Sequence, residues 1–246
     1  YAFGVQINNE NLDIEYNDLA RAEFDSDGKI TKTADLFFLG GGQNVNQGRN
    51  KYGAFFEVEQ KLFDSLGLRL AARYEKVDNF SSLDPKISLS YNPIDQITLR
   101  ISRGSSFTMP SMAQMYSSDI NLGSVRDLEG SIFVRQARIG NPDLKPATST
   151  NSNFGLIYDS DINRFSIDYW KIDYRDRIEA ESSQAILDLD PQGPSITRNE
   201  NGELIAVTTT YFNEESTLIS GIDLSYEHIF DLSDNSTLEF SLKGTS

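Results

Sequence analysis

The side chains that most enzymes use for chemistry are scarce in this sequence. It contains no cysteine, which excludes disulfide bridges, thiol nucleophiles and thiolate zinc sites. It has one histidine, His228, so a histidine metal site or a Ser-His-Asp triad is very hard to build. Carboxylates are plentiful, but they offer too many pairings to single out a catalytic acid and base. We therefore expect neither enzymatic activity nor a cofactor.

One short acidic motif resembles part of a metal site. Asp25-Ser26-Asp27-Gly28 is similar to the start of a calcium-binding loop, yet the remaining ligands and the terminal Glu of such a loop are missing. A tight turn accounts for the motif better, so no metal site is predicted. The sequence alone leaves open whether Asp25–Asp27 binds calcium.

Charge and hydropathy exclude two further classes. The chain carries 37 acidic and 22 basic residues, a formal charge of −15, which argues against binding nucleic acid by neutralising phosphates. No run approaches the roughly 18 apolar residues of a membrane helix. Barrel strands need only about 9–11 residues, of which every second one is apolar, so a membrane β-barrel remains compatible with the composition.

Alternation of apolar and polar residues is the main structural signal. In Leu66–Glu75, Leu66, Leu68 and Leu70 share one face, while Arg69 and Arg73 share the other. The same alternation recurs at Tyr52–Leu62, Lys86–Asn92, Ile97–Ser102, Phe154–Tyr158, Phe165–Tyr169 and Leu218–Glu227. Together with the two ends of the chain, this predicts about nine antiparallel strands. No comparable stretch has apolar residues at helical spacing.

The length of the strands agrees with a membrane wall. Residues 52–62, at about 3.3 Å each, reach roughly 36 Å. Tilted by about 40°, such a strand covers roughly 28 Å, close to the apolar band of about 25 Å on outer-membrane barrels. An average globular strand of about five or six residues is much shorter.

The connections between strands alternate in length. Short turns are expected at Asp64-Ser65, Asn92–Asp95, Asp159–Asn163 and Asp231–Asn235. Long polar segments are expected at Asn8–Asn50, Arg103–Ser149 and Arg175–Thr210, with a shorter one at Asp78–Asp84 and a hairpin turn at Asn201-Gly202. Outer-membrane barrels have this asymmetry, with short periplasmic turns and long extracellular loops. A girdle of aromatic residues is predicted beside the short turns, although aromatics also favour strands generally: Phe63, Tyr91, Tyr158, Phe165, Tyr226 and Phe230.

A series of short motifs makes the interpretation more specific. Along residues 66–116 these are Arg73-Tyr74-Glu75, Asp84-Pro85-Lys86, Asn92-Pro93, Leu99-Arg100 and Phe107–Ser111. Gly140–Pro146, which reads Gly-Asn-Pro-Asp-Leu-Lys-Pro, follows, and then Asp168-Tyr169-Trp170 and Gly221–Leu224. In this order they resemble the barrel of the TonB-dependent receptor family. The chain departs from the family pattern at Thr108 and Met109, where Arg-Ala is frequent, and at Ala147, where Glu is usual.

The resemblance implies a fold, a location and a function. Residues 1–246 would be part of the all-β, antiparallel transmembrane barrel domain, about nine strands of a barrel of about 22, without the plug domain. Both ends read as strands, and we interpret them as cuts through a larger sheet. Family membership implies the bacterial outer membrane, lipid contact and uptake of a scarce nutrient driven by the TonB complex, which acts through the plug and TonB box. The nutrient class stays open between siderophore, vitamin, peptide and saccharide.

Two groups of residues are candidates for the site. In a plugged barrel, charged residues on the polar face would line the lumen and meet the plug: Glu57, Glu59, Lys61, Arg69, Arg73, Glu75, Arg100 and Arg103. They could equally be the solvated face of an ordinary sheet. Four residues of the long loops are candidates for ligand contact: Tyr116, Arg126, Arg135 and Arg138.

Two alternative functions remain at this point. A passive outer-membrane porin or channel would have similar strands but no plug. A soluble β-sandwich that binds carbohydrate would also show alternation, because one face of each of its sheets is buried.

Overall fold

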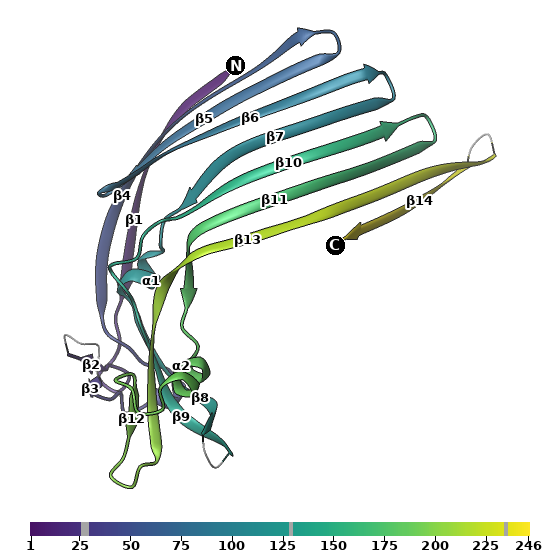
Figure 1. Cartoon of the computed structure of the whole chain (residues 1–246). Coiled ribbons are helices and arrows are strands. Elements are labelled where there is room, and N and C mark those ends of the chain that lie inside the picture. The colour runs from purple at the N-terminus through teal and green to yellow at the C-terminus, as the bar shows by residue number, and fades with distance from the viewer. Residues whose placement is uncertain (26–29, 128–129, 234–235) are drawn as a thin grey trace.

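Nine long strands form the greater part of the chain. The computed structural model describes residues 1–25, 30–127, 130–233 and 236–246. Figure 1 shows a broad sheet, called the wall here, that continues at its lower end into a small lobe. Within the described ranges the wall strands are β1 (Ala2–Ile14), β4 (Val45–Phe63), β5 (Leu66–Val77), β6 (Phe80–Ile94), β7 (Ile97–Thr108), β10 (Ala147–Asp159), β11 (Asn163–Ala180), β13 (Leu204–Ser233) and β14 (Ser236–Thr245). The predicted all-β wall of about nine strands is confirmed.

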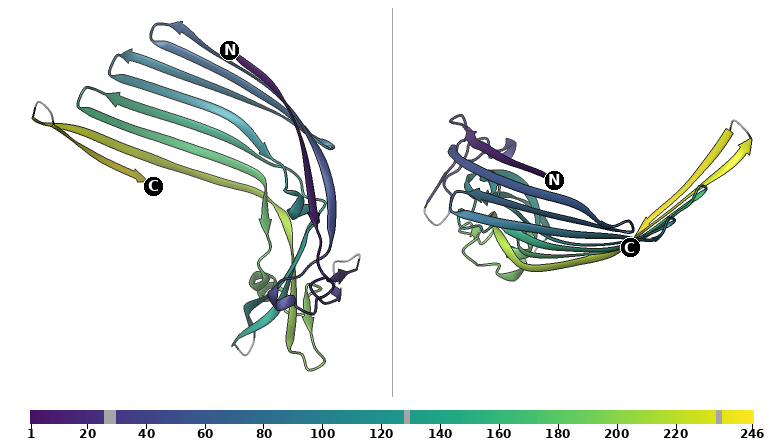
Figure 2. Two further views of the ribbon diagram at one scale, coloured as in Figure 1. Left: turned by 180° about the vertical axis from the view of Figure 1, so that it is seen from behind. Right: turned by 90° about the horizontal axis from the view of Figure 1, so that it is seen from above.

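Each wall strand pairs with the next one in the wall. The order is β1-β4-β5-β6-β7-β10-β11-β13, with β14 on β13, and every one of these pairs is antiparallel. The wall is a single layer and it is curved, as the right-hand view of Figure 2 shows. No helix in the described ranges is long and apolar enough to cross a membrane.

Short turns gather at one edge of the wall, as predicted, although residues 92–94 of the predicted Asn92–Asp95 turn belong to β6. Asp64-Ser65 joins β4 to β5, Asp95-Gln96 joins β6 to β7, and residues 160–162 join β10 to β11. The fourth predicted turn, Asp231–Asn235, includes residues 234 and 235, which lie outside the described ranges. We call this edge the short-turn edge.

The predicted loop at Asp78–Asp84 is wrong. Only Asp78 and Asn79 lie between β5 and β6, and residues 80–84 already belong to β6. Asp78 has a φ of 51°, in the left-handed region that Asp and Asn tolerate better than most residues. The polar residues that follow it belong to a strand, because a polar composition does not prevent pairing with β5.

The three long segments are also more regular than predicted. β13 is a continuous strand of 30 residues that leaves the wall and enters the lobe. The lobe contains β2 (Glu23–Phe24), β3 (Ile30–Lys32), the 3-10 helix η1 (Phe37–Leu39), α1 (Met112–Tyr116), β8 (Ser118–Asp127), β9 (Gly130–Ile139), α2 (Ser183–Leu189) and β12 (Ile196–Arg198). β9 pairs with β13 in parallel, and β12 pairs with it across the predicted Asn201-Gly202 turn, where Gly202 has a φ of 83°.

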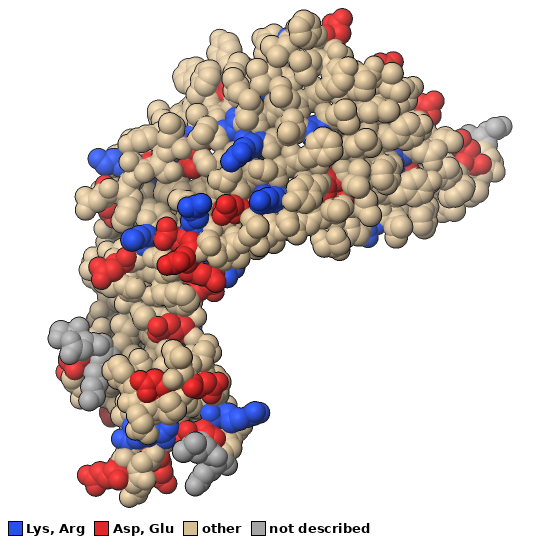
Figure 3. Space-filling model, viewed as in Figure 1, with Lys and Arg blue, Asp and Glu red and all other residues tan. Residues whose placement is uncertain are grey.

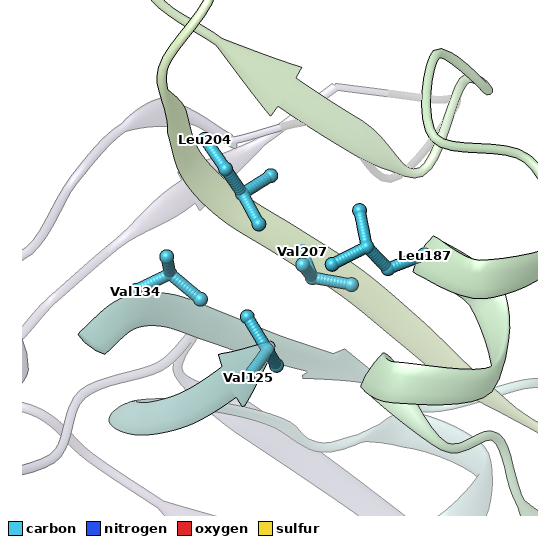
Figure 4. Packing of buried hydrophobic residues seen from close by; sticks show 5 residues of the cluster. All are labelled: Val125, Val134, Leu187, Leu204 and Val207. Atoms are coloured by element: carbon cyan, nitrogen blue, oxygen red, sulfur yellow. The ribbon is translucent and has the colours of Figure 1, made fainter. Parts of the chain in front are cut away.

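The lobe holds the hydrophobic cores of the molecule. One cluster lies between α2, β8, β9 and β13, with Val207 fully buried (Figure 4). A second cluster includes Ile120 and Ala137 and packs against the segment that precedes β4. Burial of apolar surface therefore stabilises the lobe as it would any water-soluble domain.

The middle of the wall has the opposite organisation. A row of large side chains crosses six strands in register: Leu68, Leu89, Ile101, Phe154, Tyr169 and Ile222. Of these, Ile101 is 53% exposed and Phe154 is 52% exposed. No second layer of described residues covers this side, which we call the apolar face. A sheet that leaves such a band uncovered needs an apolar solvent, so the sandwich alternative does not fit.

Aromatic residues mark the end of the apolar face near the short-turn edge. Tyr158, Phe165 and Tyr226 are direct cross-strand neighbours on β10, β11 and β13. His228 lies beside them, with its ring centroid 4.1 Å from that of Phe230. Its Nδ1 lies 2.7 Å from the Asn163 side-chain oxygen. The predicted girdle is present at this edge, and His228 belongs to it.

The apolar face gives a direct test of bilayer contact. Leu70 lies five residues beyond Ser65, about 13 Å from the short-turn edge along the membrane normal, near the middle of a band of about 25 Å. Leu70→Arg in the full-length receptor should cost about 2–4 kcal/mol of unfolding free energy in lipid vesicles.

A matched substitution lies on the same face at a different depth. Leu83 is eleven residues from Ile94, about 28 Å from the edge, so Leu83→Arg should cost only about 0–1 kcal/mol. Denaturant titration monitored by fluorescence would give both values. Equal costs at the two positions would contradict a bilayer across this wall.

Candidate functional site

The predicted lumen residues fall on one face of the wall, with one exception. Strand register places Glu57, Glu59, Lys61, Arg69, Arg73, Glu75 and Arg100 on the face opposite the apolar face. We call this the polar face. Arg103 does not belong to it. It pairs with Ile87 and Ser152, so the alternation Ile101-Ser102-Arg103 puts it on the apolar face, and its predicted position is corrected.

On the polar face, the ion pair with the most complete hydrogen bonding is the one between Arg100 and Asp168. Arg100 Nε donates to Asp168 Oδ1 at 3.0 Å and its Nη2 donates to Oδ2 at 2.6 Å, a bidentate geometry. The two residues lie on β7 and β11, and Gly155 of β10 lies between them in the same row. A Cβ on Gly155 would lie 2.1 Å from Asp168 Oδ1, so only glycine leaves room for the pair.

Other polar-face charges are paired more loosely. Arg69 Nε donates to Glu57 at 2.6 Å. Arg73 donates to Glu75 at 2.9 Å and to Gln6 of β1 at 3.1 Å. Arg69, Arg100 and Glu59 line a hollow of about 610 Å³ along this face, together with serine and threonine side chains of β6 and β7. The surface can therefore offer both charges and hydroxyl groups to whatever fills the hollow.

A buried arginine joins the wall to the lobe. Arg49 of β4 is 7% exposed, and it donates to Glu10 Oε2 at 2.7 Å and to the Pro110 carbonyl at 2.8 Å. Lys51 also pairs with Glu10. Partial burial acts to raise the pKa of the Glu10 carboxyl, but hydrogen bonds from Lys51 and Arg49 hold that pKa below its usual value. These groups lie about 35 Å from the short-turn edge, beyond the apolar band.

Two of the sequence motifs have clear structural roles at this junction. Ser111 caps α1 by accepting from the Gln114 amide at 3.1 Å, and the Gln114 side chain accepts from the Ser111 amide at 2.9 Å. In the second motif, Asn141 donates from its backbone to the Gln114 carbonyl and from its side chain to the Tyr211 carbonyl, each at 2.9 Å. Gly140 lies so close to the Met115 backbone that a Cβ would be 2.7 Å away. Both motifs fix the junction.

The four predicted ligand contacts are not brought together. Arg126 lies at the far tip of the β8–β9 hairpin, where it pairs with Ser131, and its backbone is held by Gln184 of α2. Tyr116 is the last residue of α1, at the junction. Arg135 and Arg138 are three residues apart on β9, and three residues along a strand is an odd step, so they point to opposite faces of it.

Arg135 and Arg138 share an unusual environment all the same. Arg135 lies over the Phe37 ring at 5.9 Å, and Arg138 lies over the Tyr211 ring at 5.7 Å. Arg135 Nη1 donates to Thr33 at 2.8 Å, while its Nε is buried without a hydrogen-bond partner among the described residues. Burial lowers the pKa of the Arg135 guanidinium. Neither arginine is in an ion pair between described residues, but only Arg138 is exposed, whereas Arg135 is half-buried.

The predicted turn at Asp25–Asp27 cannot be assessed as a calcium site. Residues 26–29 lie outside the described ranges. Among the residues that the structure describes, no group of three or more His, Asp or Glu side chains could hold a metal ion.

Two ion pairs, Arg198–Asp127 and Arg100–Asp168, were not predicted from the sequence. Arg198 binds Asp127 in a bidentate pair at 2.7 and 3.0 Å, which links β12 to β8 across the lobe. The two residues are 71 positions apart, and no local pattern marks them. The sequence does contain a signal for Asp168: the alternation that includes Tyr169 places it on the polar face, where Arg100 also lies.

Comparison with known proteins identifies the family. Residues 1–245 match the family described as "TonB dependent receptor-like, beta-barrel". The chain belongs to the TonB-dependent receptor β-barrel family. The members are outer-membrane β-barrel proteins, so the predicted fold and location are confirmed. The relatives are receptors and transporters rather than enzymes, and the passive-porin alternative does not fit the match.

Similar proteins include several siderophore receptors. The probable TonB-dependent siderophore receptor PirA of Acinetobacter baumannii is 27% identical over 128 residues, which is 52% of this chain and 17% of that protein. The solved ferric enterobactin receptor PfeA of Pseudomonas aeruginosa, a mutant in complex with enterobactin, is 17% identical and matches with a TM-score of 0.70. The match covers 99% of this chain and 32% of PfeA.

A third similar structure is the siderophore receptor PirA from Acinetobacter baumannii. It is 20% identical, has a TM-score of 0.61, and the match covers 98% of this chain and 36% of that one. The chain therefore spans about a third of the length of the solved receptors that it matches. At these identities the solved structures support the fold of the barrel.

Gly155 provides a test of the Arg100–Asp168 pair. Gly155→Ala should destabilise the receptor by about 1–3 kcal/mol, because the new methyl group overlaps the ion pair. Gly67→Ala is the control: it lies on the same face, and its Cβ would meet nothing closer than 3.9 Å, so it should change stability by less than about 0.5 kcal/mol.

A double-mutant cycle assigns the cause. In an Asp168→Ala background, Gly155→Ala should cost clearly less, since the carboxylate is gone and the Arg100 side chain, which the methyl group would also meet, is then free to move away. Equal costs in both backgrounds, measured by denaturant unfolding, would show that the glycine is needed for another reason.

Glu10 predicts a pH dependence. Its pKa is lowered in the folded state, so its contribution to stability is fully present above its unfolded pKa and is lost as the pH falls through the folded pKa. Glu10→Gln should therefore lower the melting temperature at pH 7, and the difference from the unmodified protein should shrink below about pH 4. Asp18→Asn, at an exposed pair of the lobe, should have little effect. A Glu10→Gln difference that is constant from pH 7 to pH 3 would contradict this account.

Proposed function

We propose that the receptor containing this chain takes up a ferric siderophore across the outer membrane, energised by the TonB complex. The chain supplies part of the barrel wall and part of the extracellular ligand surface. The observation that carries the proposal is Arg138 of the lobe, an exposed cation over the Tyr211 ring that has no ion-pair partner among the described residues, in a chain whose formal charge is −15. Similar proteins named as siderophore receptors support it.

The chemistry of the ligand fits this arginine. Ferric iron is a hard cation held by oxygen ligands, several of which are anionic, so the complex presents negative charge and flat organic groups. An arginine backed by an aromatic ring keeps its guanidinium fixed and only partly hydrated, which strengthens its attraction for an anion.

The polar face has a separate role in this proposal. We place Glu57, Glu59, Lys61, Arg69, Arg73, Glu75 and Arg100 toward the barrel interior, where a plug domain outside this chain would meet the hollow along β5, β6 and β7. TonB would act on that plug and not on the wall. Loosely held pairs such as Arg73–Glu75 can exchange partners with the plug at little cost, because exposed ion pairs are individually weak.

Uptake of a labelled ferric siderophore tests the proposal. Ferric enterobactin is the first probe, because a similar structure contains enterobactin. Arg138→Gln should weaken binding by about tenfold or more, since a lost charge-assisted contact is worth about 1.5–3 kcal/mol. The matched control is Arg21→Gln, which removes one lobe cation that is already paired with Asp18 and should leave binding unchanged.

Two further outcomes decide the transport part. Accumulation inside cells should disappear when TonB is deleted, while surface binding stays. Uptake that persists without TonB would point to a passive channel. If no ferric chelate from a panel of catecholates, hydroxamates and carboxylates is taken up, the ligand class is wrong.

A further inference from the structure

The apolar face carries three exposed cations near its lobe end. Arg103 of β7 and Lys171 of β11 lie in one cross-strand row, with Ser152 between them, and Arg175 lies four residues beyond Lys171 on the same face. Arg103 and Lys171 are thus about 10 Å apart across the sheet. We call these three residues the basic patch. None of them is in an ion pair between described residues.

Neighbouring charges make the contrast clear. Arg177, two residues beyond Arg175, is met by Glu179 at 3.0 Å and by Glu214 at 2.8 Å. Asp173 lies between Lys171 and Arg175 on β11 and is the one carboxylate among them, half-buried. It leaves a net positive charge on the basic patch, although the whole chain carries −15.

The basic patch straddles the outer edge of the apolar band of about 25 Å. Counted from the short turns, Arg103, Lys171 and Arg175 lie about 18, 23 and 33 Å along the membrane normal. The row neighbours of Arg103 on its other side are Ile87 and Leu70, both apolar. A cation beside them in lipid is costly unless an anion meets it or the side chain reaches the interface.

A shallow groove opens beside Arg103. The β6–β7 ladder ends at the pair Lys86–Gly104, and the next residue of β6 is Pro85, which has no amide hydrogen and is typical of interrupted ladders. Where the two strands separate, a groove of about 390 Å³ is lined on the apolar face by Leu70, Pro85, Ile87, Arg103, Ser105 and Thr150. Its walls are apolar and its rim is cationic.

We infer that this surface binds a phosphate-bearing lipid of the outer leaflet, with its phosphates against Arg103, Lys171 and Arg175 and an acyl chain in the groove. Phosphate oxygens accept several charge-assisted hydrogen bonds from guanidinium and ammonium groups. The site would remove the cost of leaving Arg103 unpaired on a lipid-facing wall. The inference rests on the outer-membrane location of the family and does not depend on the ligand that the receptor imports.

Lipid binding to the delipidated full-length receptor tests the inference. The probes are diphosphorylated lipid A, the same lipid without phosphates, and inorganic phosphate, each measured by native mass spectrometry in detergent. Combining Arg103→Gln, Lys171→Gln and Arg175→Gln should reduce binding of diphosphorylated lipid A by at least about tenfold. The phosphate-free lipid should bind the original and the variant receptor equally weakly.

Controls separate charge from fold. Arg164→Gln, Lys243→Gln and Lys32→Gln together remove the same charge from paired side chains away from the basic patch, and should leave binding intact. Arg103→Lys with Arg175→Lys keeps the charge and should keep most of the binding. Thr150→Trp fills the groove without a change of charge and should weaken lipid binding.

Three results would overturn the inference. Unchanged binding in the triple Gln variant would show that the basic patch does not hold the lipid. Equal competition by inorganic phosphate would make it an anion site without lipid specificity. Full binding by Thr150→Trp would remove the acyl chain from the groove.

Discussion

The backbone hydrogen bond between neighbouring strands is the interaction on which this molecule depends. The wall is one layer thick, and its apolar face contacts a solvent that cannot satisfy peptide groups, so each strand must satisfy them through its neighbours. The order β1-β4-β5-β6-β7-β10-β11-β13 meets this need with antiparallel pairs throughout. Side chains contribute little packing between layers in the wall, because no second layer of described residues covers either of its faces.

The lobe is stabilised differently, by burial of apolar side chains, and strand β13 runs through both the lobe and the wall. On β13, Leu204 and Val207 are buried in the lobe, whereas Ile222 and Leu224 are exposed on the wall. The change takes place at the junction, where Arg49, Pro110 and the Gly140–Pro146 motif concentrate hydrogen bonds between segments that are distant in the sequence. Outside the apolar band, backbone polar groups can also bond to side chains, and these bonds fix the lobe to the end of the wall.

The wall could be predicted from the sequence because its rule is local. A period of two sets the faces of each strand, so the approximate number of strands and the aromatic girdle could be predicted. Arg103 was assigned to the wrong face because the assignment used its charge and not the alternation of the strand. Ile101, two residues earlier, already places it on the apolar face. Residues 80–84 were assigned to a loop for a similar reason, since polar composition was given more weight than the turn at Asp78 and Asn79.

The lobe could not be predicted in the same way, because its contacts are not local. The parallel pairing of β9 with β13 joins residues about 70 positions apart, and the Arg198–Asp127 pair spans a similar distance. Nothing in the periodicity of either segment specifies its partner. The candidate ligand residues show the limit most clearly. Arg135 and Arg138 have the unpaired charge expected of contact residues, but a strand directs them to opposite sides, and Arg126 lies at a separate tip.

Because β13 is continuous from the lobe to the wall, it limits which insertions and deletions such a receptor can tolerate. Its 30 residues are bonded to β11 in the wall and to β9 in the lobe, so both ends share one register. Inserting a single residue in β13 between these two parts would turn the side chains on one side of it to the opposite face of the strand. An adjacent residue would then take the buried position of Val207. Two inserted residues would restore the faces and move the lobe about 7 Å along the strand. We therefore expect β13 to tolerate insertions and deletions of an even number of residues. The distance between the lobe and the membrane would then change by about 7 Å for every two residues.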